Sequence, residues 1–384
     1  MKITIDNLGV VRHIEFDTQK PLSLFCGPNS TGKTYVAYVL YSMFSVVNEI
    51  LGWEGDHTAL KEWVEDKDYT EYIGSILGVS DEFVDARFNN LKINVKVPDF
   101  NNIIYNYPRA VMLTVERNSI YTFKTELSIS RNLLVDKMMA LRDKSNVYLS
   151  ELLMSNSRRY PMAVSDSLRE AYDLLNIKKI KGHFFDVASN LEQSLLHGRV
   201  DVTQNGDVDF IVGENIHLPI QVSSSIVKTL SSLIIYLKYI AKKGDTLIID
   251  EPEMNLHPDN QILLARIFAQ MVNMGIKLVI STHSDYIIRE FNNLIMLSGV
   301  SDDDVQSFSK MGYDKSMMLK KEDVAAYMFN FDKENLVTVE NLDVTETGFD
   351  VPTIDAAINS INEASEELYY SLKSRQNEKE HGND

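Results

Sequence analysis

A single cysteine, Cys26, is all that the 384-residue chain contains, so no disulfide can form within one chain. A reducing compartment is the simplest setting for such a protein, and we expect a cytoplasmic location. No apolar run reaches the roughly 18 residues that a transmembrane helix needs. The first residues, 1–5, alternate like a strand and lack the apolar core of a signal peptide. We therefore expect neither a disulfide-stapled secreted scaffold nor a membrane-spanning protein.

Positive charge is also scarce, because 38 basic residues stand against 55 acidic ones and the net charge is −17. This balance is a poor match for a protein that coats nucleic acid with its whole surface. Two short basic runs, 158–159 and 178–181, could still contact DNA, although such runs are usually solvated faces. The remaining composition, 44% apolar and 24% charged, is that of an ordinary globular protein.

A phosphate-binding loop is present near the start of the chain. The pattern GxxxxGK[ST] is matched by consecutive residues, namely Gly27, Pro28, Asn29, Ser30, Thr31, Gly32, Lys33 and Thr34. An apolar run at 22–26 precedes the loop, and apolar positions at helical spacing follow it over 36–43. This is the strand–loop–helix context that the motif requires, so a chance match is a poor explanation.

Each fixed position of the pattern GxxxxGK[ST] has a chemical reason. Gly27 and Gly32 let the backbone turn so that its N–H groups converge on phosphates, and the helix N-terminus favours an anion. Lys33 would reach the β- and γ-phosphates, and the Thr34 hydroxyl would ligate Mg²⁺. The loop therefore predicts a nucleotide triphosphate, with ATP and Mg²⁺ as the expected ligands.

Two further apolar runs end in chemistry-bearing residues. The run 247–249 is followed by Asp250 and Glu251, and the run 278–280 is followed two residues later by His283. We expect Asp250 to hold the Mg²⁺ shell, Glu251 to polarise the attacking water, and His283 to contact the γ-phosphate. Solvated strand-end acids and a structural histidine are the alternatives. The order of the three motifs favours a nucleotide hydrolase, with Lys33, Glu251 and His283 as its catalytic side chains.

These residues carry a family resemblance. Residues 246–258 resemble the Walker B segment of ABC-type ATPases, in particular the overcoming-lysogenization-defect (OLD) proteins and their SMC-like relatives, and residues 281–284 resemble their switch-histidine segment. The resemblance implies two ATPase heads that pair head to tail and hold ATP between them. The expected assembly is thus a homodimer or a higher even oligomer.

The resemblance fails at the signature motif. The run 222–230 occupies its place but lacks the LSGGQ pattern, and its serines are Ser223, Ser224 and Ser225. These serines could present hydroxyl and N–H groups to the γ-phosphate bound by the partner, or they could simply cap the helix that follows.

The glutamine loop is missing as well, because no glutamine occurs between Gln19 and Gln193. In its place a predicted strand, 110–115, ends in Glu116 and Arg117, which resembles an "AER" segment of OLD-like ATPases. One of these two side chains could touch the nucleotide or relay its presence, or both could face water.

The expected fold is α/β: an ABC/SMC-like P-loop NTPase head with a mixed sheet core, an N-terminal β-subdomain and an inserted helical lobe. We assign 1–50 and 195–300 to the ATPase core, 51–194 to inserted strands and the lobe, and 301–384 to a C-terminal α/β extension with a frayed polar tail. The core segment includes a hairpin around the Asn205-Gly206 turn. Further predicted elements are strands at 91–97 and 337–344 and helices at 131–155, 164–176, 258–274 and 353–374.

The leading functional hypothesis is an ATPase that dimerises and regulates a separate effector, a role that the resemblance places in anti-phage defence or toxin regulation. The alternative is a DNA-repair ATPase similar to recombination mediators, which would bind DNA. A transporter subunit disagrees with the missing LSGGQ pattern, and a nonhydrolysing scaffold disagrees with the Asp250–Glu251 pair. About 85 residues follow the core, without a separated acidic triad, so we expect no Toprim nuclease domain, and the eight scattered histidines give no support for an HNH nuclease.

Overall fold

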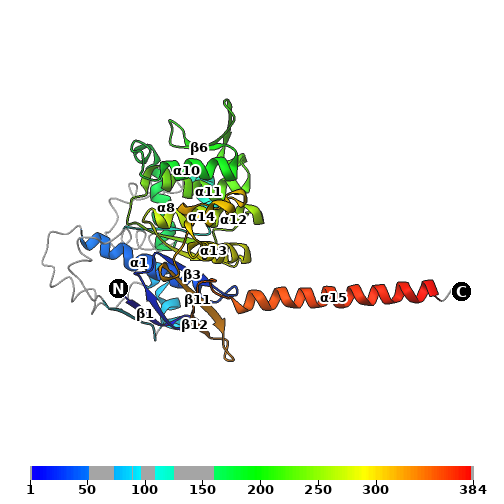
Figure 1. The fold of residues 1–384 in the computed structure, drawn as a ribbon. Coiled ribbons are helices and arrows are strands. Elements are labelled where there is room, and N and C mark those ends of the chain that lie inside the picture. Colours follow the sequence, from blue (N-terminus) through cyan, green and yellow to red (C-terminus); the bar gives the residue numbers. More distant parts are fainter. Residues whose placement is uncertain (1, 52–72, 89, 97–108, 125–159, 382–384) are drawn as a thin grey trace, which may run out of the picture.

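A computed structural model describes residues 2–51, 73–88, 90–96, 109–124 and 160–381 (Figure 1). Its centre is a nine-stranded mixed sheet. In spatial order the strands are β4 (Lys92–Lys96), β1 (Lys2–Leu8), β2 (Val11–Asp17), β12 (Val337–Leu342), β11 (Val324–Phe331), β3 (Leu22–Cys26), β10 (Lys277–Ser281), β9 (Thr246–Asp250) and β5 (Ala110–Leu113). The α/β class expected from the sequence is confirmed.

Five neighbouring strands, from β11 to β5, are mutually parallel. Every residue of β3, β9 and β5 is buried, which explains why these strands read as short continuous apolar runs rather than as alternating ones. Because the strands are parallel, the segments that follow β3, β9 and β10 leave the sheet at one common edge. The predicted strands at these positions are confirmed.

The other half of the sheet is mostly antiparallel. β1 pairs with β2 through the expected turn near Gly9, and β4 pairs with the free side of β1. β12 joins this half to the parallel half, since it lies antiparallel to β11 and parallel to β2. The predicted N-terminal β-structure is therefore continuous with the ATPase sheet.

The C-terminal region differs from the expectation of a separate extension. β11 lies directly beside β3, and its residues Val324 to Met328 pair in parallel with Leu22 to Cys26. An α/β extension was expected for 301–384, whereas its strands β11 and β12 belong to the central sheet; a pairing across about three hundred positions leaves no local pattern in the sequence. The buried apolar residues of β11 form part of the sheet that carries the phosphate loop.

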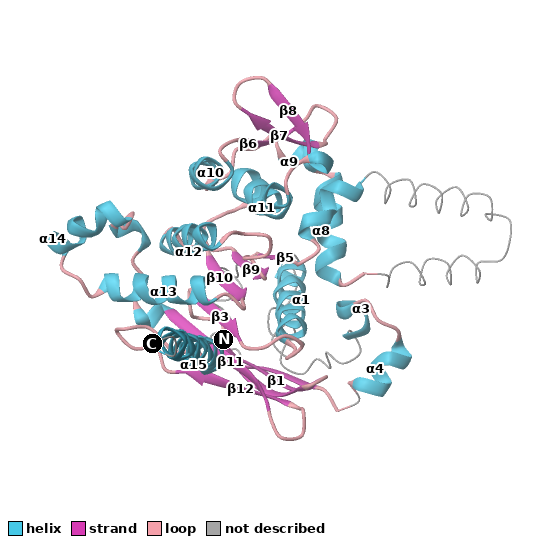
Figure 2. Cartoon of the chain, turned by 90° about the vertical axis from the view of Figure 1, so that its right-hand side faces the viewer, coloured by secondary structure: helices cyan, strands magenta, loops and turns pink. Residues whose placement is uncertain are grey.

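Helices cover both faces of the sheet (Figure 2). The helices are α1 (Lys33–Leu51), α3 (Ile73–Leu77), α4 (Asp81–Arg87), α8 (Met162–Tyr172), α9 (Leu174–Ile177), α10 (Phe185–Leu191), α11 (Ser225–Ile235), α12 (Pro258–Asn273), α13 (Asp285–Ser298), α14 (Asp302–Val305) and α15 (Pro352–His381). Short 3₁₀ turns are η3 (Ile220–Val222), η5 (Gln306–Met311), η6 (Lys315–Met317) and η7 (Lys321–Asp323).

β3 divides the hydrophobic core into two layers. Leu22, Leu24 and Cys26 pack with α10 to α13 on one face, whereas Phe25 packs with α1, α3 and the β1–β2 pair on the other. Cys26 is fully buried, and this burial raises the pKa of its thiol to about 12. The cysteine is therefore a small core residue.

A second sheet of three antiparallel strands lies beyond α10 and α11. It contains β6 (Arg199–Val202), β7 (Val208–Val212) and β8 (Ile216–Pro219), so the hairpin predicted around the Asn-Gly turn is confirmed. Two π-helical turns, η2 (Glu192–Leu196) and η4 (Tyr236–Ile240), support this sheet. Lys238 of η4 forms a buried ion pair with Glu192 of η2, with 2.7 Å between Nζ and Oε1.

The final helix projects from the body (Figure 1). α15 runs to His381, so the polar tail expected to fray after Gln376 is helical instead. No glycine or proline interrupts the segment after Pro352, which lies in the first turn where proline is tolerated. Three of its exposed apolar side chains, Ile361, Leu368 and Leu372, follow one another at helical spacing.

Other expectations have separate outcomes. The helix predicted over 131–155 and the basic pair 158–159 lie outside the described residues. The acidic run 302–304 begins α14, which Ser301 caps, and no cluster of metal-ligating side chains occurs in the part of the chain that the structure describes. None of the described helices is long and apolar enough to cross a membrane.

Candidate active site

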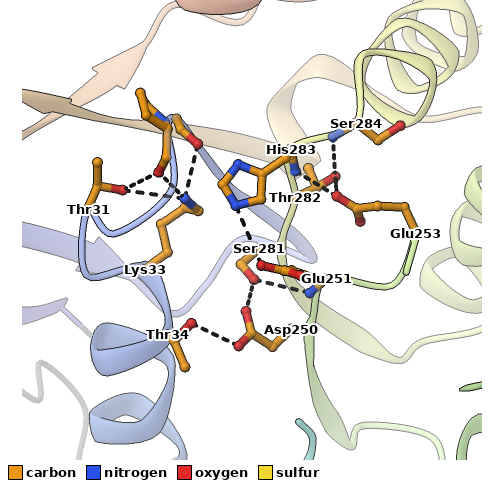
Figure 3. Close-up of polar contacts among 12 residues, drawn as sticks. Thr31, Lys33, Thr34, Asp250, Glu251, Glu253, Ser281, Thr282, His283 and Ser284 are labelled. Atoms are coloured by element: carbon orange, nitrogen blue, oxygen red, sulfur yellow. Dashed lines mark hydrogen bonds and ion pairs between the residues drawn. The ribbon is translucent and has the colours of Figure 1, made fainter. Parts of the chain in front are cut away.

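The phosphate loop and the ends of β9 and β10 meet at the carboxyl edge of the parallel strands (Figure 3). The loop connects β3 to α1, Asp250 is the last residue of β9, and His283 follows β10 by two positions. The three motifs that are separated in the sequence thus form one site.

The loop glycines are required by close packing as well as by conformation. Gly27 has φ of 130°, and a Cβ there would lie 2.2 Å from the carbonyl oxygen of Phe329 in β11. Gly32 has φ of 85°, and its Cβ would lie 2.7 Å from Cγ2 of Val11. Ser30 between them is also left-handed, at 63°. A loop with this succession of dihedrals points backbone N–H groups to one side, as anion-binding nests do.

Lys33 lies across this loop. Its Nζ donates to the carbonyl oxygens of Gly27 at 3.0 Å and Pro28 at 2.7 Å, and the Thr31 hydroxyl donates to the same Pro28 oxygen at 2.9 Å. Burial lowers the pKa of Lys33 to about 8, while the Asp250 carboxylate opposes that shift. The ammonium therefore remains mostly charged at pH 7 and is suited to a phosphate oxygen.

The residues present fit a magnesium–nucleotide complex. Thr34 Oγ1 donates to Asp250 Oδ2 at 2.9 Å, and the Ser281 hydroxyl forms a short hydrogen bond with the other carboxylate oxygen, Oδ1. A hydroxyl and a carboxylate are hard oxygen donors of the kind that Mg²⁺ takes, together with substrate phosphates. Among the described residues, no internal hydrogen bond is donated by the backbone N–H groups of 29–34, which leaves them suited to phosphate oxygens.

Glu251 occupies an unusual backbone conformation. Its φ is 47°, in the left-handed region that non-glycine residues rarely adopt. Its N–H donates to the carbonyl of Ser281 at 3.0 Å, and its carboxylate is 38% exposed. Burial raises the pKa of Glu251, and the nearby Asp250 carboxylate raises it further. A raised carboxyl pKa is favourable for a group that must accept a proton from water.

His283 faces Glu251 across the site, with 3.6 Å between Nε2 and Oε1 (Figure 3). This separation is too long for a hydrogen bond. Burial lowers the pKa of His283 to about 4, and the positive charge of Lys33 acts in the same direction. The imidazole is thus neutral at pH 7, and the pair is not an ion pair there.

Glu253 is a site residue that the sequence analysis missed. Its Oε1 accepts hydrogen bonds from the Thr282 hydroxyl at 2.8 Å and from the His283 N–H at 2.7 Å. Its other oxygen is buried and has no partner among the described residues. Burial raises the pKa of Glu253. The available signal in the sequence was one more acid, two positions after Glu251. In the structure this acid fixes the backbone N–H of His283.

Arg117 points into the protein, so the alternative that this side chain faces water is wrong. The side chain is buried, and its guanidinium donates to three backbone carbonyls, those of Thr114 at 2.9 Å, Asp250 at 2.6 Å and Glu251 at 2.6 Å. Glu116 beside it is exposed. The arginine therefore contacts the backbone of the predicted catalytic residues.

The three serines separate into two kinds. Ser223 is buried and its hydroxyl donates to the Pro219 carbonyl at 3.1 Å, so it has an internal role. Ser224 is the N-cap residue of α11, yet its side chain makes no capping hydrogen bond, and both Ser224 and Ser225 are exposed. The side-chain capping interpretation is therefore wrong for Ser224. No hydrogen bond among the described residues links these serines to the phosphate loop.

A side-chain contact ties α11 to the segment after β9. Asn255 Nδ2 donates to the hydroxyl of Thr229, which is fully buried, at 3.1 Å. Asn255 is itself left-handed, with φ of 63°. The helix that begins with the exposed serines is thus connected to the turn that follows Glu251.

The basic run at 178–181 is used partly within the fold. Lys178 donates to the carbonyls of Val202 and Thr203 at 2.9 and 2.7 Å, and Lys179 donates to Asn176. Lys181 lies over the ring of Phe185, at 4.4 Å from its centroid. Lys178 is thus used within the fold, whereas Lys179 and Lys181 remain exposed.

Comparison with known proteins agrees with this site. Residues 162–288 match the family model of the AAA ATPase domain, a range that includes the exposed serines, Glu251 and His283 but not the phosphate loop. No curated protein matches the chain.

The solved structures to which the chain is similar include three SMC head domains. The chain is 11% identical, at a TM-score of 0.40, to the Smc head domain with an extended coiled coil bound to the C-terminal domain of ScpA from Pyrococcus furiosus; 95% of this chain and 98% of that one are covered. An SmcHead bound to the C-winged helix domain of ScpA gives 11%, a TM-score of 0.41, and coverage of 90% and 98%. The SMC head domain from Thermotoga maritima gives 9%, a TM-score of 0.39, and coverage of 90% and 99%.

The matched range includes the acidic and histidine-bearing strand ends, and the structure places the phosphate loop against them. The similarity to the AAA ATPase domain thus covers residues 162–288, which contribute two of the three motifs that meet at the site.

Proposed function

We propose that the protein binds Mg·ATP at the loop 27–34 and hydrolyses it to ADP and phosphate. The observation that carries the proposal is the convergence of Lys33, Thr34, Asp250, Glu251 and His283 at one edge of the sheet. Nothing in a purely structural role requires a lysine, two acids and a histidine to gather beside a glycine-lined loop. The AAA ATPase domain match supports the same activity.

Each side chain has a defined task in this mechanism. Lys33 binds the β- and γ-phosphate oxygens, and Thr34 with Asp250 would hold Mg²⁺, which supplies charge neutralisation on the phosphates when bound. Glu251 accepts the proton of the water that attacks the γ-phosphate, and its raised pKa brings it nearer to the working pH. The neutral His283 donates a hydrogen bond to the γ-phosphate, held in place by Glu253.

The proposal extends to two chains that pair head to tail. Ser224 and Ser225 are exposed at the N-terminus of α11, where N–H groups and the helix dipole favour an anion. In a pair, these groups would complete the ATP site of the other chain. The contact between Asn255 and Thr229 would then connect α11 of each chain to the turn that follows Glu251 in the same chain. The absence of glycine makes this contact different from that of a transporter.

The biological setting rests on the resemblance to OLD-like ATPases. In this setting ATP closes the pair and hydrolysis reopens it, which controls a separate effector protein in anti-phage defence or toxin regulation. The DNA-repair alternative has less support, because the net charge is −17 and Lys178 donates to carbonyls of the fold itself.

The test is a comparison of the wild-type protein with Glu251→Gln. We expect the variant to bind Mg·ATP normally and to lose at least about 100-fold in turnover, since general-base catalysis contributes that much or more. Glu366→Gln, at an exposed acid of α15 outside the site, is the control and should hydrolyse ATP normally. Unchanged turnover in Glu251→Gln would remove Glu251 from the reaction.

Native mass measurement in Mg·ATP then separates the biological alternatives. A fixed stoichiometry with a second protein, after purification from the native host, supports the regulated-effector hypothesis. A lone homodimer whose hydrolysis is stimulated by DNA supports the repair alternative instead.

A further inference from the structure

The segment after β5 places a buried positive charge behind the catalytic strand end. Arg117 is 3% exposed and lies within the field of Asp250, Glu253 and Glu251. Nevertheless, the hydrogen bonds that its guanidinium makes among the described residues go to backbone carbonyls rather than to carboxylates. An arginine used only to neutralise acids would place its planar fork on a carboxylate.

Two of these carbonyls belong to Asp250 and Glu251 themselves. Nη1 donates to the Asp250 oxygen and Nη2 donates to the Glu251 oxygen, both at 2.6 Å. Consecutive carbonyls of an extended strand point to opposite sides, so these two oxygens can reach one guanidinium only because the chain departs from the strand conformation here. The bend here is the left-handed conformation of Glu251, whose φ is 47°. A strained non-glycine conformation persists where the surroundings over-determine it.

The opposite side of the same bend is fixed by β10. The N–H of Glu251 donates to the Ser281 carbonyl at 3.0 Å, and the Ser281 hydroxyl lies 3.3 Å from that N–H. Ser281 thus fixes the backbone N–H of Glu251, and Arg117 fixes its backbone carbonyl. The direction in which the Glu251 carboxylate leaves the backbone depends on both contacts.

Arg117 is itself anchored at some distance from the site. It begins a helical segment, 117–124, in which Ile120 is buried. At the other end of the segment, the Lys124 ammonium donates to the Gly206 carbonyl at 2.7 Å in the β6–β7 turn. Both ends of the segment are therefore attached, which keeps the guanidinium in a fixed position relative to β9.

We propose that Arg117 is a positioning residue for hydrolysis, which holds Glu251 in the left-handed conformation that directs its carboxylate at the attacking water. The inference rests on the proposed ATP hydrolysis with Glu251 as the general base. Arg117 touches no reacting atom in this role, because its contacts are with the backbone behind the site. A lysine cannot replace it, since one ammonium group cannot reproduce the planar fork that reaches both carbonyls.

The experiment measures single-turnover ATP hydrolysis, ATP affinity and melting temperature for Arg117→Lys and Arg117→Ala. We expect Arg117→Lys to slow hydrolysis by about 10- to 100-fold, because a misplacement on the scale of 1 Å costs about that much. ATP affinity should change by less than about threefold, because the phosphate loop is untouched. Added guanidinium at millimolar concentration should restore part of the rate of Arg117→Ala, whereas the same concentration of sodium chloride should not.

The matched control is Arg266→Lys. Arg266 is a half-buried arginine of α12 that pairs with Glu290 at 2.6 Å and makes no contact with the site residues in the described chain. This variant should hydrolyse ATP at the wild-type rate. Parallel losses of rate, affinity and melting temperature in the Arg117 variants, without guanidinium rescue, would show that Arg117 has a general structural role and would overturn the inference.

A second comparison separates this inference from the proposed function. In a Glu251→Gln background, Arg117→Lys should slow the residual rate by less than about twofold, because residues that act through one another are not additive. If the wild-type protein does not hydrolyse ATP, the proposed function fails; if Glu251→Gln hydrolyses ATP normally, Glu251 is not the general base and the role of Arg117 fails with it. If Glu251→Gln is inactive while Arg117→Lys keeps the wild-type rate, only the role of Arg117 fails.

Discussion

The hydroxyl of Thr34 donates a 2.9 Å hydrogen bond to Oδ2 of Asp250, a residue 216 positions later in the chain. Thr34 belongs to α1, which follows the phosphate loop. Asp250 ends β9, which is separated from β3 by β10 in the sheet. Their contact brings the two expected Mg²⁺ ligands together in the fold itself. The site is therefore organised by the sheet before any nucleotide contributes to it.

Lys33→Ala should weaken ATP binding itself. Removal of the ammonium leaves phosphate charge without its partner, which costs about 2 kcal/mol or more and corresponds to an affinity about 30-fold lower. Titration with a fluorescent ATP analogue measures this change. Lys243→Ala, which removes an exposed lysine, should bind as the wild type does. An unaltered affinity in Lys33→Ala would reject the assignment of the phosphate loop.

Ser224→Glu should prevent the ATP-dependent pairing of two chains. A carboxylate at the start of α11 would oppose the γ-phosphate held by the partner, and like charges at an interface cost several kcal/mol. We expect a Glu251→Gln protein to dimerise in Mg·ATP and its Ser224→Glu derivative to remain monomeric, as measured by light scattering. Ser309→Glu, an exposed serine of η5, is the control. A dimer in the Ser224→Glu protein would place the interface elsewhere.

His283 should make the fold sensitive to acid. Its pKa lies near 4 in the folded protein and near 6.5 when unfolded, so protons bind the unfolded chain preferentially between these values. The stabilising contribution is fully present above pH 6.5 and is lost as the pH falls toward 4. The free energy of unfolding of His283→Asn should therefore fall less steeply over this window than that of the wild type. His257→Asn, at an exposed histidine, should follow the wild-type curve; identical curves for all three proteins would contradict the lowered pKa.

Lys238→Met should destabilise the region that carries the second sheet. Glu192 would keep a buried carboxylate without its ammonium partner, and breaking a buried pair in this way costs about 3–5 kcal/mol. Urea denaturation measures the loss. Replacing both residues, as Lys238→Met with Glu192→Leu, should recover most of the stability, whereas additive losses would argue that the pair is not coupled. At the exposed Lys321–Glu346 pair, Glu346→Gln should leave stability unchanged.

Much of the site could be predicted from sequence because its residues follow short, buried parallel strands. Those strands appear as continuous apolar runs, and the residues directly after them share one edge. Lys33, Thr34, Asp250, Glu251 and His283 were found in this way. The pattern also gave the hairpin at Asn205-Gly206, since an Asn-Gly turn has a local signature.

The parts that were missed depend on contacts between distant segments. Neither the position of β11 beside β3 nor the inward orientation of Arg117 leaves a periodic trace in the sequence. Glu253 was missed for a related reason, because two acids near a strand end look alike until hydrogen bonds distinguish them. Ser223 and Ser224 are adjacent and identical, yet the first is buried and the second is exposed, which the sequence alone does not show.

The position of β3 constrains when the active site can form as the protein is made. β3 lies between β10 and β11, so both of its neighbours in the sheet are synthesised more than 250 residues after it. The strand before the phosphate loop therefore has no partner in this sheet until residues 277–281 have been synthesised, and its other edge is unpaired until residues 324–328 follow. Pairings of such long sequence separation fold slowly and expose unpaired strand edges to aggregation. The phosphate loop is thus synthesised early, whereas the sheet that supports it is completed late.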